Sequence, residues 1–297
     1  MATLREVRRR IAGVKTTQKI TRAMKMVAAA KLRRAQSSVV SARPYARKIR
    51  ELLEHLVSNV GLESGSLFVV RPMSRAALVV VTSDRGMCGA FNSNVIKTVE
   101  RRIAENAGQD PGRRNVTLFC VGKKGADYFG KRQFDLSGKY IGVYNALVFA
   151  QAKRIVKDIV EGYLQGKFDR VDVIYNEFKS VAQQRIITEQ FLPIPAEAAV
   201  AGEGTRHSRT DYIYEPSSAA ILQALVPKHL DFQLWRVLLE SNAAEQGARM
   251  AAMENATENA EELISTLQLQ YNKARQASIT RELLEIVSGA EALMKAG

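Results

Sequence analysis

The sequence contains few of the residues that build metal centres, disulfides or membrane spans. Among 297 residues there are two cysteines, Cys88 and Cys120, and no C-x-x-C pair, so we expect two free thiols rather than a disulfide or a zinc site. The three histidines, at 55, 207 and 229, are too scattered to form a ligand cluster. No run of about 18 apolar residues occurs, so no segment is expected to cross a bilayer.

Acidic residues are almost absent from the first 50 positions. This segment contains 15 Lys and Arg but a single acid, Glu6, whereas residues 51–297 contain 29 of each sign. Basic ends of this kind bind nucleic acid, anionic membrane surfaces or acidic proteins, or serve as transit peptides. The strict hydrophobic register described below disfavours a transit peptide, and a single aromatic, Tyr45, disfavours stacking on bases. An acidic protein surface is the favoured partner.

Proline is rare near both ends, where the sequence predicts two long helices. The first extends to about residue 57, with Pro44 expected to kink it or widen one turn, and the second covers about 217–295. At 1.5 Å per residue they would be on the order of 80 and 118 Å long, so we expect a coiled coil. Because the chain must return on itself, the two helices are expected to pair antiparallel.

Heptad seams follow both helices. The first contains three consecutive polar members, Gln18, Thr21 and Lys25. We expect Ile20, Met24 and Val27, on the neighbouring face, to take over at that point. The C-terminal helix changes seam twice, so the contact face should rotate along an asymmetric rod. Its small residues in 241–256 should allow close helix approach. The seams are Leu4, Val7, Ile11, Val14, Gln18, Thr21, Lys25, Ala28, Leu32, Ala35 and Val39; then Leu230, Leu234, Val237, Ser241, Ala244, Ala248 and Ala251; Ala260, Ile264, Leu267, Tyr271, Ala274 and Ser278; and Ile279, Leu283, Ile286, Ala290 and Leu293.

The middle of the chain has the pattern of an α/β domain. Runs rich in β-branched residues predict strands, and helical stretches separate them, which favours a small, mostly parallel, Rossmann-like sheet. Residues 196–212 are expected to form a flexible loop. The predicted domains are 1–57, 75–195 and 215–297, so the α/β domain is inserted between the two long helices. The expected strands are 76–82, 116–121, 171–178 and 185–193, and the helices are 92–107, 123–130 and 145–165.

The segment "SDRGMCGAFN" at 83–92 resembles a phosphate-binding turn but lacks its defining residues. A dinucleotide loop needs three glycines, and a P-loop needs Lys followed by Ser or Thr, whereas only Gly86 and Gly89 occur here. We therefore expect a strand-to-helix turn, capped by Asn92 or Ser93, with Arg85 and Cys88 exposed at its tip. No catalytic triad, metal-ligand spacing or carboxylate pair occurs elsewhere, so no catalytic, cofactor or metal site is predicted.

Four long motifs resemble the γ subunit of F-type ATP synthase. They are "RRRIAGVKTTQKITRAMKMVAAAKLRRAQ" at 8–36, "SDRGMCGAFN" at 83–92, "ARMAAMENATENA" at 248–260 and "LQLQYNKARQASITRELLEIVSGAEAL" at 267–293. The resemblance implies an antiparallel coiled-coil shaft with an α/β domain at its foot. It also implies a non-catalytic rotor that couples proton-driven rotation of the membrane c ring to ATP synthesis at the β subunits.

The resemblance further implies partners and contact residues. The partners are the α3β3 hexamer, the ε subunit and the c ring, without nucleic acid. Contacts with the β catch and lever loops are carried over to Met24, Lys25, Arg85, Cys88, Arg275, Gln276 and Thr280. The motif begins almost at Met1 and the central domain has no cysteine-bearing insert, which favours a bacterial protein at the cytoplasmic face of the inner membrane. Two alternatives are a basic coiled-coil protein that binds nucleic acid and a nucleotide-dependent α/β enzyme with helical extensions.

Overall fold

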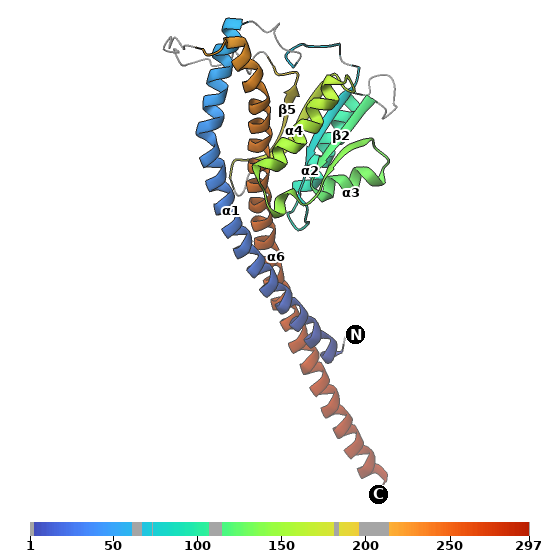
Figure 1. Ribbon diagram of the computed structural model, residues 1–297. Coiled ribbons are helices and arrows are strands. Elements are labelled where there is room, and N and C mark those ends of the chain that lie inside the picture. Colours follow the sequence, from blue (N-terminus) through green and yellow to red (C-terminus); the bar gives the residue numbers. More distant parts are fainter. Residues whose placement is uncertain are drawn as a thin grey trace. The chain divides into compact units, whose positions relative to one another are not determined.

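The computed structural model describes residues 3–60, 67–72, 74–106, 115–180, 184–195 and 214–296. The loop expected at 196–212 lies outside these residues. Contacts divide the chain into two compact units, Ala28–Arg249 in one and Met1–Val27 with Met250–Gly297 in the other. Two long helices, α1 (Leu4–Val60) and α6 (Ser218–Ala296), contribute residues to both units; both are labelled in Figure 1. The helix of 79 residues predicted at the C-terminal end is therefore confirmed.

The unit Ala28–Arg249 contains a five-stranded sheet. Its strand order is β3-β2-β1-β4-β5; the first four strands are parallel, and β5 runs antiparallel to β4. A mostly parallel sheet was predicted from strands alternating with helices, and this prediction is confirmed. The strands are β1 (Ala76–Val81), β2 (Val116–Val121), β3 (Leu136–Tyr140), β4 (Arg170–Phe178) and β5 (Gln184–Leu192).

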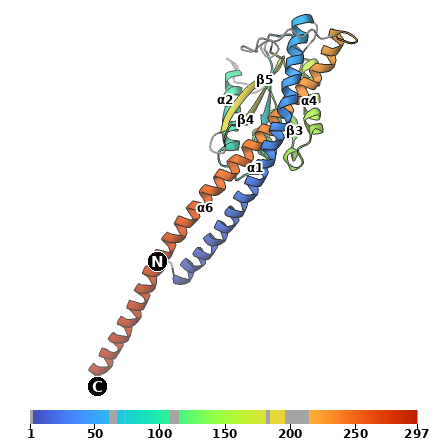
Figure 2. The ribbon, with the colours of Figure 1, turned by 90° about the vertical axis from the view of Figure 1, so that its left-hand side faces the viewer.

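Helices cover both faces of this sheet, and α2 and α4 lie on opposite sides of it in Figure 2. Side chains of β1 alternate between the two cores: Val79 and Val81 lie in the cluster with α4, whereas Leu78 and Val80 lie in the cluster with α2 and α3. Every residue of β1 is buried, as expected for the central strand of a sheet covered on both faces. The helices are α2 (Phe91–Asn106), α3 (Lys123–Lys131) and α4 (Phe149–Leu164).

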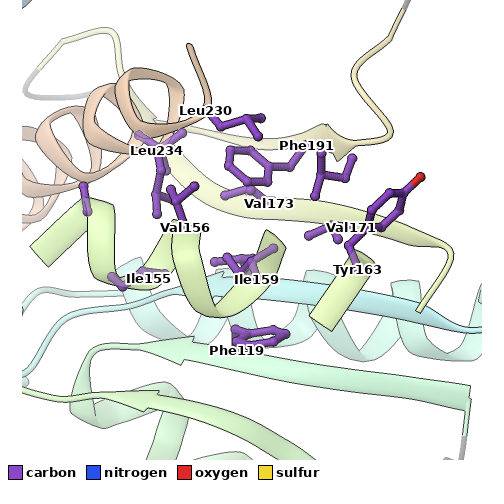
Figure 3. Packing of buried hydrophobic residues seen from close by; sticks show 14 of the residues in the cluster. Phe119, Ile155, Val156, Ile159, Tyr163, Val171, Val173, Phe191, Leu230 and Leu234 are labelled. Carbon is purple, nitrogen blue, oxygen red and sulfur yellow. The ribbon is translucent and has the colours of Figure 1, made fainter. Parts of the chain in front are cut away.

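The larger core joins the sheet to α6. Figure 3 shows Ile159 of α4 above Phe119 of the sheet, and Leu230 and Leu234 of α6 on the side of Phe191. All five side chains are at most 3% exposed. Burying a large apolar side chain contributes about 1.5–3 kcal/mol, so this core fixes α6 against the α/β domain.

Strand β3 and the 3-10 turn η3 (Val143–Asn145) were not predicted. The sequence of β3, LSGKY, contains a glycine and only two apolar residues, because the strand lies at the edge of the sheet and three of its five residues are not buried. Gly138 is required there, since a Cβ at this position would lie 2.7 Å from Phe119 Cδ1. The pairing of β2 with β3 shifts register at the same place.

A cluster of charges also joins β5 to α6. The Arg236 guanidinium donates to both carboxylate oxygens of Glu189, at 2.7 and 2.9 Å, and to the Tyr175 hydroxyl at 3.2 Å. Glu240, one turn along α6, accepts from the same guanidinium. Burial alone would raise the pKa of Glu189, but the positive charge of Arg236 and the surrounding hydrogen bonds hold that pKa below its ordinary value.

In the other unit, α1 and α6 form an antiparallel pair. Thr21 lies opposite Thr257, and Lys25 lies opposite Glu254, so the residue number falls on one helix as it rises on the other. Every member of the predicted seam in Leu4–Val39 is buried or half-buried. The predicted antiparallel coiled coil is confirmed.

The polar positions of this seam are paired rather than replaced. The Thr21 and Thr257 hydroxyls are 2.8 Å apart, and Lys25 Nζ is 2.5 Å from a Glu254 oxygen. Of the three residues expected to take over the seam, Met24 is half-buried, but Ile20 and Val27 are both 55% exposed, so the prediction was wrong for these two. Heptad spacing holds Thr21 and Lys25 in the interface, and α6 supplies polar partners for them.

The C-terminal part of α6 has two distinct sections. The six seam residues from Ala260 to Ser278 are buried or half-buried, as predicted. Beyond them Ile279, Leu283 and Ile286 are 49–68% exposed. Figure 2 shows that α6 extends past the N-terminal end of α1, so no helix of the described residues lies opposite this last section. The third predicted seam was therefore wrong as a contact between the two helices of this chain.

Each long helix contains a proline and reaches the length expected from the sequence. Pro44 lies inside α1, which continues through it to Val60, and Pro227 lies inside α6 near its start. Pro44 therefore does not end the helix. Within the described ranges, no helix combines the length and the apolarity needed to cross a bilayer.

Replacing Gly122 by alanine should destabilise the α/β domain far more than replacing Gly166. Both glycines have positive φ, at 94° and 67°, but a Cβ on Gly122 would lie 2.0 Å from the Thr82 carbonyl oxygen, whereas nothing lies within 4 Å at Gly166. We expect a loss of about 1 kcal/mol for Gly166→Ala and more than 3 kcal/mol for Gly122→Ala. Urea unfolding followed by the fluorescence of Trp235 measures both. Equal losses would contradict the steric argument.

Candidate functional site

The turn at 83–92 lies between β1 and α2, and it packs on α6. Cys88 and Phe91 of the turn form a small buried cluster with Ala244 and Ala248, and all four are at most 7% exposed. Alanine side chains leave room for a backbone turn beside the helix. The small residues predicted to allow close approach therefore serve this contact as well.

An arginine of α6 fixes the backbone of the turn. One guanidinium nitrogen of Arg249 donates to the carbonyl oxygens of Arg85 and Gly86, at 3.3 and 3.2 Å. Another is 2.6 Å from Glu245, whose side chain is 6% exposed. Burial raises the pKa of Glu245, and the charge of Arg249 opposes that rise. A buried ion pair within α6 thus also bonds the backbone of the turn.

Side chains within the turn complete its hydrogen bonds. Asn92 Oδ1 accepts from the Ser83 backbone N–H at 2.9 Å, and Asn92 Nδ2 donates to Ser83 Oγ and Cys88 Sγ. Asn92 lies inside α2 and reaches back to the end of β1, so the prediction that it caps the helix was wrong. Ser93 Oγ donates to the Ala90 carbonyl and is likewise not a cap of the backbone N–H groups.

A carboxylate of the chain occupies the place where a phosphate would bind. Asp84 Oδ1 accepts from the Lys123 N–H at 3.0 Å, at the N-terminus of α3, and from the Gly142 N–H at 3.0 Å. Helix N-termini bind anions because their first N–H groups have no partner in the helix. Here Asp84 supplies the anion, which argues against a phosphate cradle at the ends of β1, β2 and β3.

Cys88 is not at the surface. Its side chain is buried and 2% exposed, so the expectation that it lies at the exposed tip was wrong. Burial raises the pKa of the Cys88 thiol, and it raises the pKa of Cys120 to about 12. Both thiols are free and buried, which confirms that no disulfide joins them.

The long exposed side chains of the turn are those of Arg85 and Met87. Arg85 is exposed as predicted, whereas Met87 was not singled out from the sequence. Met87 is 64% exposed and has φ 60°, the left-handed region that glycine favours. Met87 lies in a turn with glycines at 86 and 89. These glycines indicate a tight turn, but they do not reveal that Met87 itself has positive φ.

The other predicted contact residues lie in the coiled-coil unit. Met24 and Lys25 are half-buried on α1, and Lys25 is paired with Glu254. On α6, the exposed residues are Arg275, Gln276 and Thr280, and the Thr280 hydroxyl donates to the Gln276 carbonyl at 3.0 Å. Arg85 and Cys88 belong to the unit Ala28–Arg249. The predicted set therefore comprises two groups on different units.

Nothing in the described ranges gathers three or more potential metal ligands of the types His, Cys, Asp and Glu. One cavity of about 770 Å³ lies along α1, α6 and β5, away from the carboxyl ends of the parallel strands. Its lining includes Glu189 and Arg236, which already pair with each other. This cavity has no phosphate-binding loop or exposed nucleophile among its lining residues.

Comparison with known sequences gives one consistent result. A sequence model of the ATP synthase family matches residues 3–293. The chain is 52% identical over 300 residues to the ATP synthase gamma chain of Chloroherpeton thalassium, with 99% of each chain covered. It is 51% identical over 294 residues to that of Chlorobaculum tepidum, again with 99% of each covered.

Two solved structures similar to this chain are chains of ATP synthases. One chain from a Euglena gracilis mitochondrial ATP synthase containing OSCP, F1 and c-ring has a TM-score of 0.67 at 24% identity, with 98% of this chain and 94% of that chain covered. One from the Tetrahymena thermophila mitochondrial central stalk and c-ring has a TM-score of 0.60 at 27% identity, with 80% and 99% covered.

Replacing Arg249 by alanine should loosen the turn and destabilise the folded chain in a pH-dependent way. Loss of one partner leaves Glu245 as an uncompensated buried charge, for which we expect about 3 kcal/mol at pH 8. The folded-state pKa of Glu245 is already raised, and without Arg249 it rises further. The folded variant therefore takes up a proton as the pH falls, and the loss should be smaller at pH 5.

Urea unfolding at the two pH values measures this difference. Arg101→Ala is the control, because Arg101 is 72% exposed and lies 3.9 Å from Glu105. We expect it to cost less than about 0.5 kcal/mol at either pH. An Arg249→Ala variant whose loss is the same at pH 5 and pH 8 would contradict the role assigned to the buried pair.

Proposed function

The chain belongs to the ATP synthase family, and we propose from this premise how it performs the work of a gamma chain. Its function is that of the central rotor shaft, which couples proton-driven rotation of the c ring to ATP synthesis at the β subunits. The observation that supports this most strongly is the family match, which covers residues 3–293 and therefore both long helices and the sheet. Nucleic-acid binding, the alternative from charge alone, has no support from that match.

We infer that the chain is non-catalytic and that its turn at 83–92 is a mechanical element. Asp84 supplies the anion at the N-terminus of α3, and the N–H of Ser83 is bonded to Asn92. Those groups would have to be free to hold a phosphate. The nucleotide is then bound by the neighbouring subunits, and the chain changes their affinities through contacts.

Coupling requires that these contacts differ between conformations of the neighbour. A rotor can shift the equilibrium between two conformations of a β subunit only by the difference between its contact free energies with those conformations. An asymmetric rod with changing seams presents different side chains to three chemically identical neighbours. The exposed surface of the coiled-coil unit is therefore where the energy is transferred.

The basic surface of α1 is suited to an acidic partner. Among the described residues, seven cations of its first turns are exposed and have no carboxylate within 4 Å. Attraction to an acidic loop would be strongest at low ionic strength, since salt screens exposed charges. The seven cations are Arg5, Arg8, Arg9, Arg10, Lys15, Lys19 and Arg22.

Lys25 differs from these cations because it has a partner that it can exchange. The side chains of Lys25 and Glu254 are 36% and 41% exposed. Ion pairs at such positions contribute about 0–1 kcal/mol, so an acidic side chain of a β lever loop could replace Glu254 at small cost. We propose that Lys25, with Met24 beside it, makes this contact.

On α6, we propose that Arg275, Gln276 and Thr280 contact the β catch loop. Arg275 and Gln276 are exposed, and they provide a fork of donors and an amide for carboxylate or carbonyl groups. Cys88 is not proposed as a direct contact, because its side chain is buried. Arg85 remains available for one.

The partners proposed for the complex are the α3β3 hexamer, the ε subunit and the c ring. The chain would then be a peripheral subunit at the cytoplasmic face of a bacterial inner membrane. Relatives 51–52% identical over nearly the whole chain are bacterial gamma chains, which supports this placement.

Reconstitution with α and β subunits tests the proposal. An assembly that contains this chain should hydrolyse ATP, and the isolated chain should not bind ATP saturably. Failure to form an ATPase-active assembly would contradict the rotor role. Tight, salt-sensitive binding of DNA by the isolated chain would favour the nucleic-acid alternative instead.

Replacing Arg275 and Gln276 together by alanine should lower ATP synthesis in membrane vesicles about fivefold without changing the unfolding of the free chain. The expected loss follows from removing contacts worth about 1 kcal/mol that differ between β conformations, whereas the two side chains make no core packing. The matched control is Gln270→Ala with Arg281→Ala, which removes the same two residue types from another face of α6. Equal synthesis by the two double variants would count against the assignment.

A further inference from the structure

One apolar side chain of the turn is held outward in an unfavourable backbone conformation. Met87 has φ 60°, which residues with a Cβ disfavour, and its side chain is 64% exposed. A single exposed apolar residue needs no explanation by itself. An exposed apolar residue with a left-handed backbone does need an explanation. The conformation costs free energy, and the folded chain gains little burial of the Met87 side chain in return.

The surrounding hydrogen bonds impose this conformation. Before Met87, the carbonyl oxygens of Arg85 and Gly86 accept from Arg249, and Ser83 Oγ donates to the Arg85 oxygen at 2.6 Å. After it, the buried Cys88 accepts through its carbonyl from the Phe91 N–H at 3.2 Å. The backbone is fixed on both sides, so the direction of the Met87 Cα–Cβ bond is fixed as well.

A second non-glycine residue, Gln133, has the same left-handed backbone conformation in a common structural context. Gln133 has φ 58° and is also exposed. It follows the end of α3 at Lys131, and its N–H donates to the Gly130 carbonyl at 3.3 Å. Left-handed residues commonly end helices in this way, and a polar side chain there remains in water. Met87 ends no helix, and its side chain is apolar.

We propose that Met87 is a contact residue for the rotor's catalytic neighbour, where it binds an apolar patch beside an acidic group that pairs with Arg85. This inference rests on the proposed function and adds a residue to it. Arg85 and Met87 are the two long side chains that the turn exposes, one cationic and one apolar; the third exposed side chain, that of Ala90, is a single methyl group. A partner surface that complements both must contain a carboxylate next to apolar side chains.

Methionine suits a contact that is remade as the rotor turns. Its unbranched side chain has three rotatable bonds and a polarizable sulfur, so it packs against surfaces of different shape. A fixed backbone with an adaptable side chain lets one turn meet several conformations of one neighbour. Glycine would fit the backbone better but would have no side chain to make the contact.

The test compares Met87→Gly with Gln133→Gly in the assembled complex. Both substitutions place glycine at the same φ, so each free chain should keep its melting temperature or gain up to about 3 °C. Only Met87→Gly should lower ATP synthesis in vesicles, by about fivefold or more. Two further variants separate size from polarity: Met87→Leu should retain synthesis, and Met87→Gln should lower it.

The outcomes distinguish failure of the proposed rotor function from failure of the contact assigned to Met87. If the wild-type chain forms no active assembly, the proposed function fails. If the wild-type complex is active and Met87→Gly and Met87→Gln couple as well as the wild type, the contact assigned to Met87 is wrong. An equal fall in synthesis for Gln133→Gly would also overturn it, because the effect would then follow the backbone rather than the side chain.

Discussion

The close contact between the turn at 83–92 and Ala244 and Ala248 of α6 fixes the turn against the long helix. Ala244 and Ala248 leave space for Cys88 and Phe91, and Arg249 bonds the turn's backbone from the same helix. A larger side chain at either alanine would push the turn away and separate Arg249 from the carbonyl groups. The positions of Asp84, Arg85 and Met87 all depend on this contact.

Side chains of this chain accept hydrogen bonds from backbone N–H groups that a phosphate would need. In nucleotide-binding folds, N–H groups at the carboxyl ends of the strands remain free for phosphate. Asp84 and Asn92 satisfy the corresponding groups here from within the chain. The same fold therefore serves as a rigid body, which is what a subunit that transmits torque needs.

Much of the architecture could be predicted from the sequence because periodicity is a local property. The seams in both helices and the β-branched runs of β1, β2 and β4 each identified an element. Strand β3 was missed because it lies at the sheet edge, where packing on Phe119 requires glycine rather than an apolar residue. Pairing across the seam was also missed: no local pattern reveals that Thr257 and Glu254 lie opposite Thr21 and Lys25. The motif at 83–92 could be identified from the sequence, but the exposure of its side chains could not. Cys88 is buried because it packs against α6, and the sequence of the turn alone does not show that contact.

The pairing of Thr21 with Thr257 joins residues 236 positions apart. Long-range contacts form late, because the intervening chain must first be ordered. During synthesis, α1 leaves the ribosome first and its seam has no partner until nearly the whole chain has been translated. The apolar stripe of the first helix must therefore be shielded from other nascent chains throughout that interval, which makes correct biogenesis of this subunit a matter of timing as well as of stability.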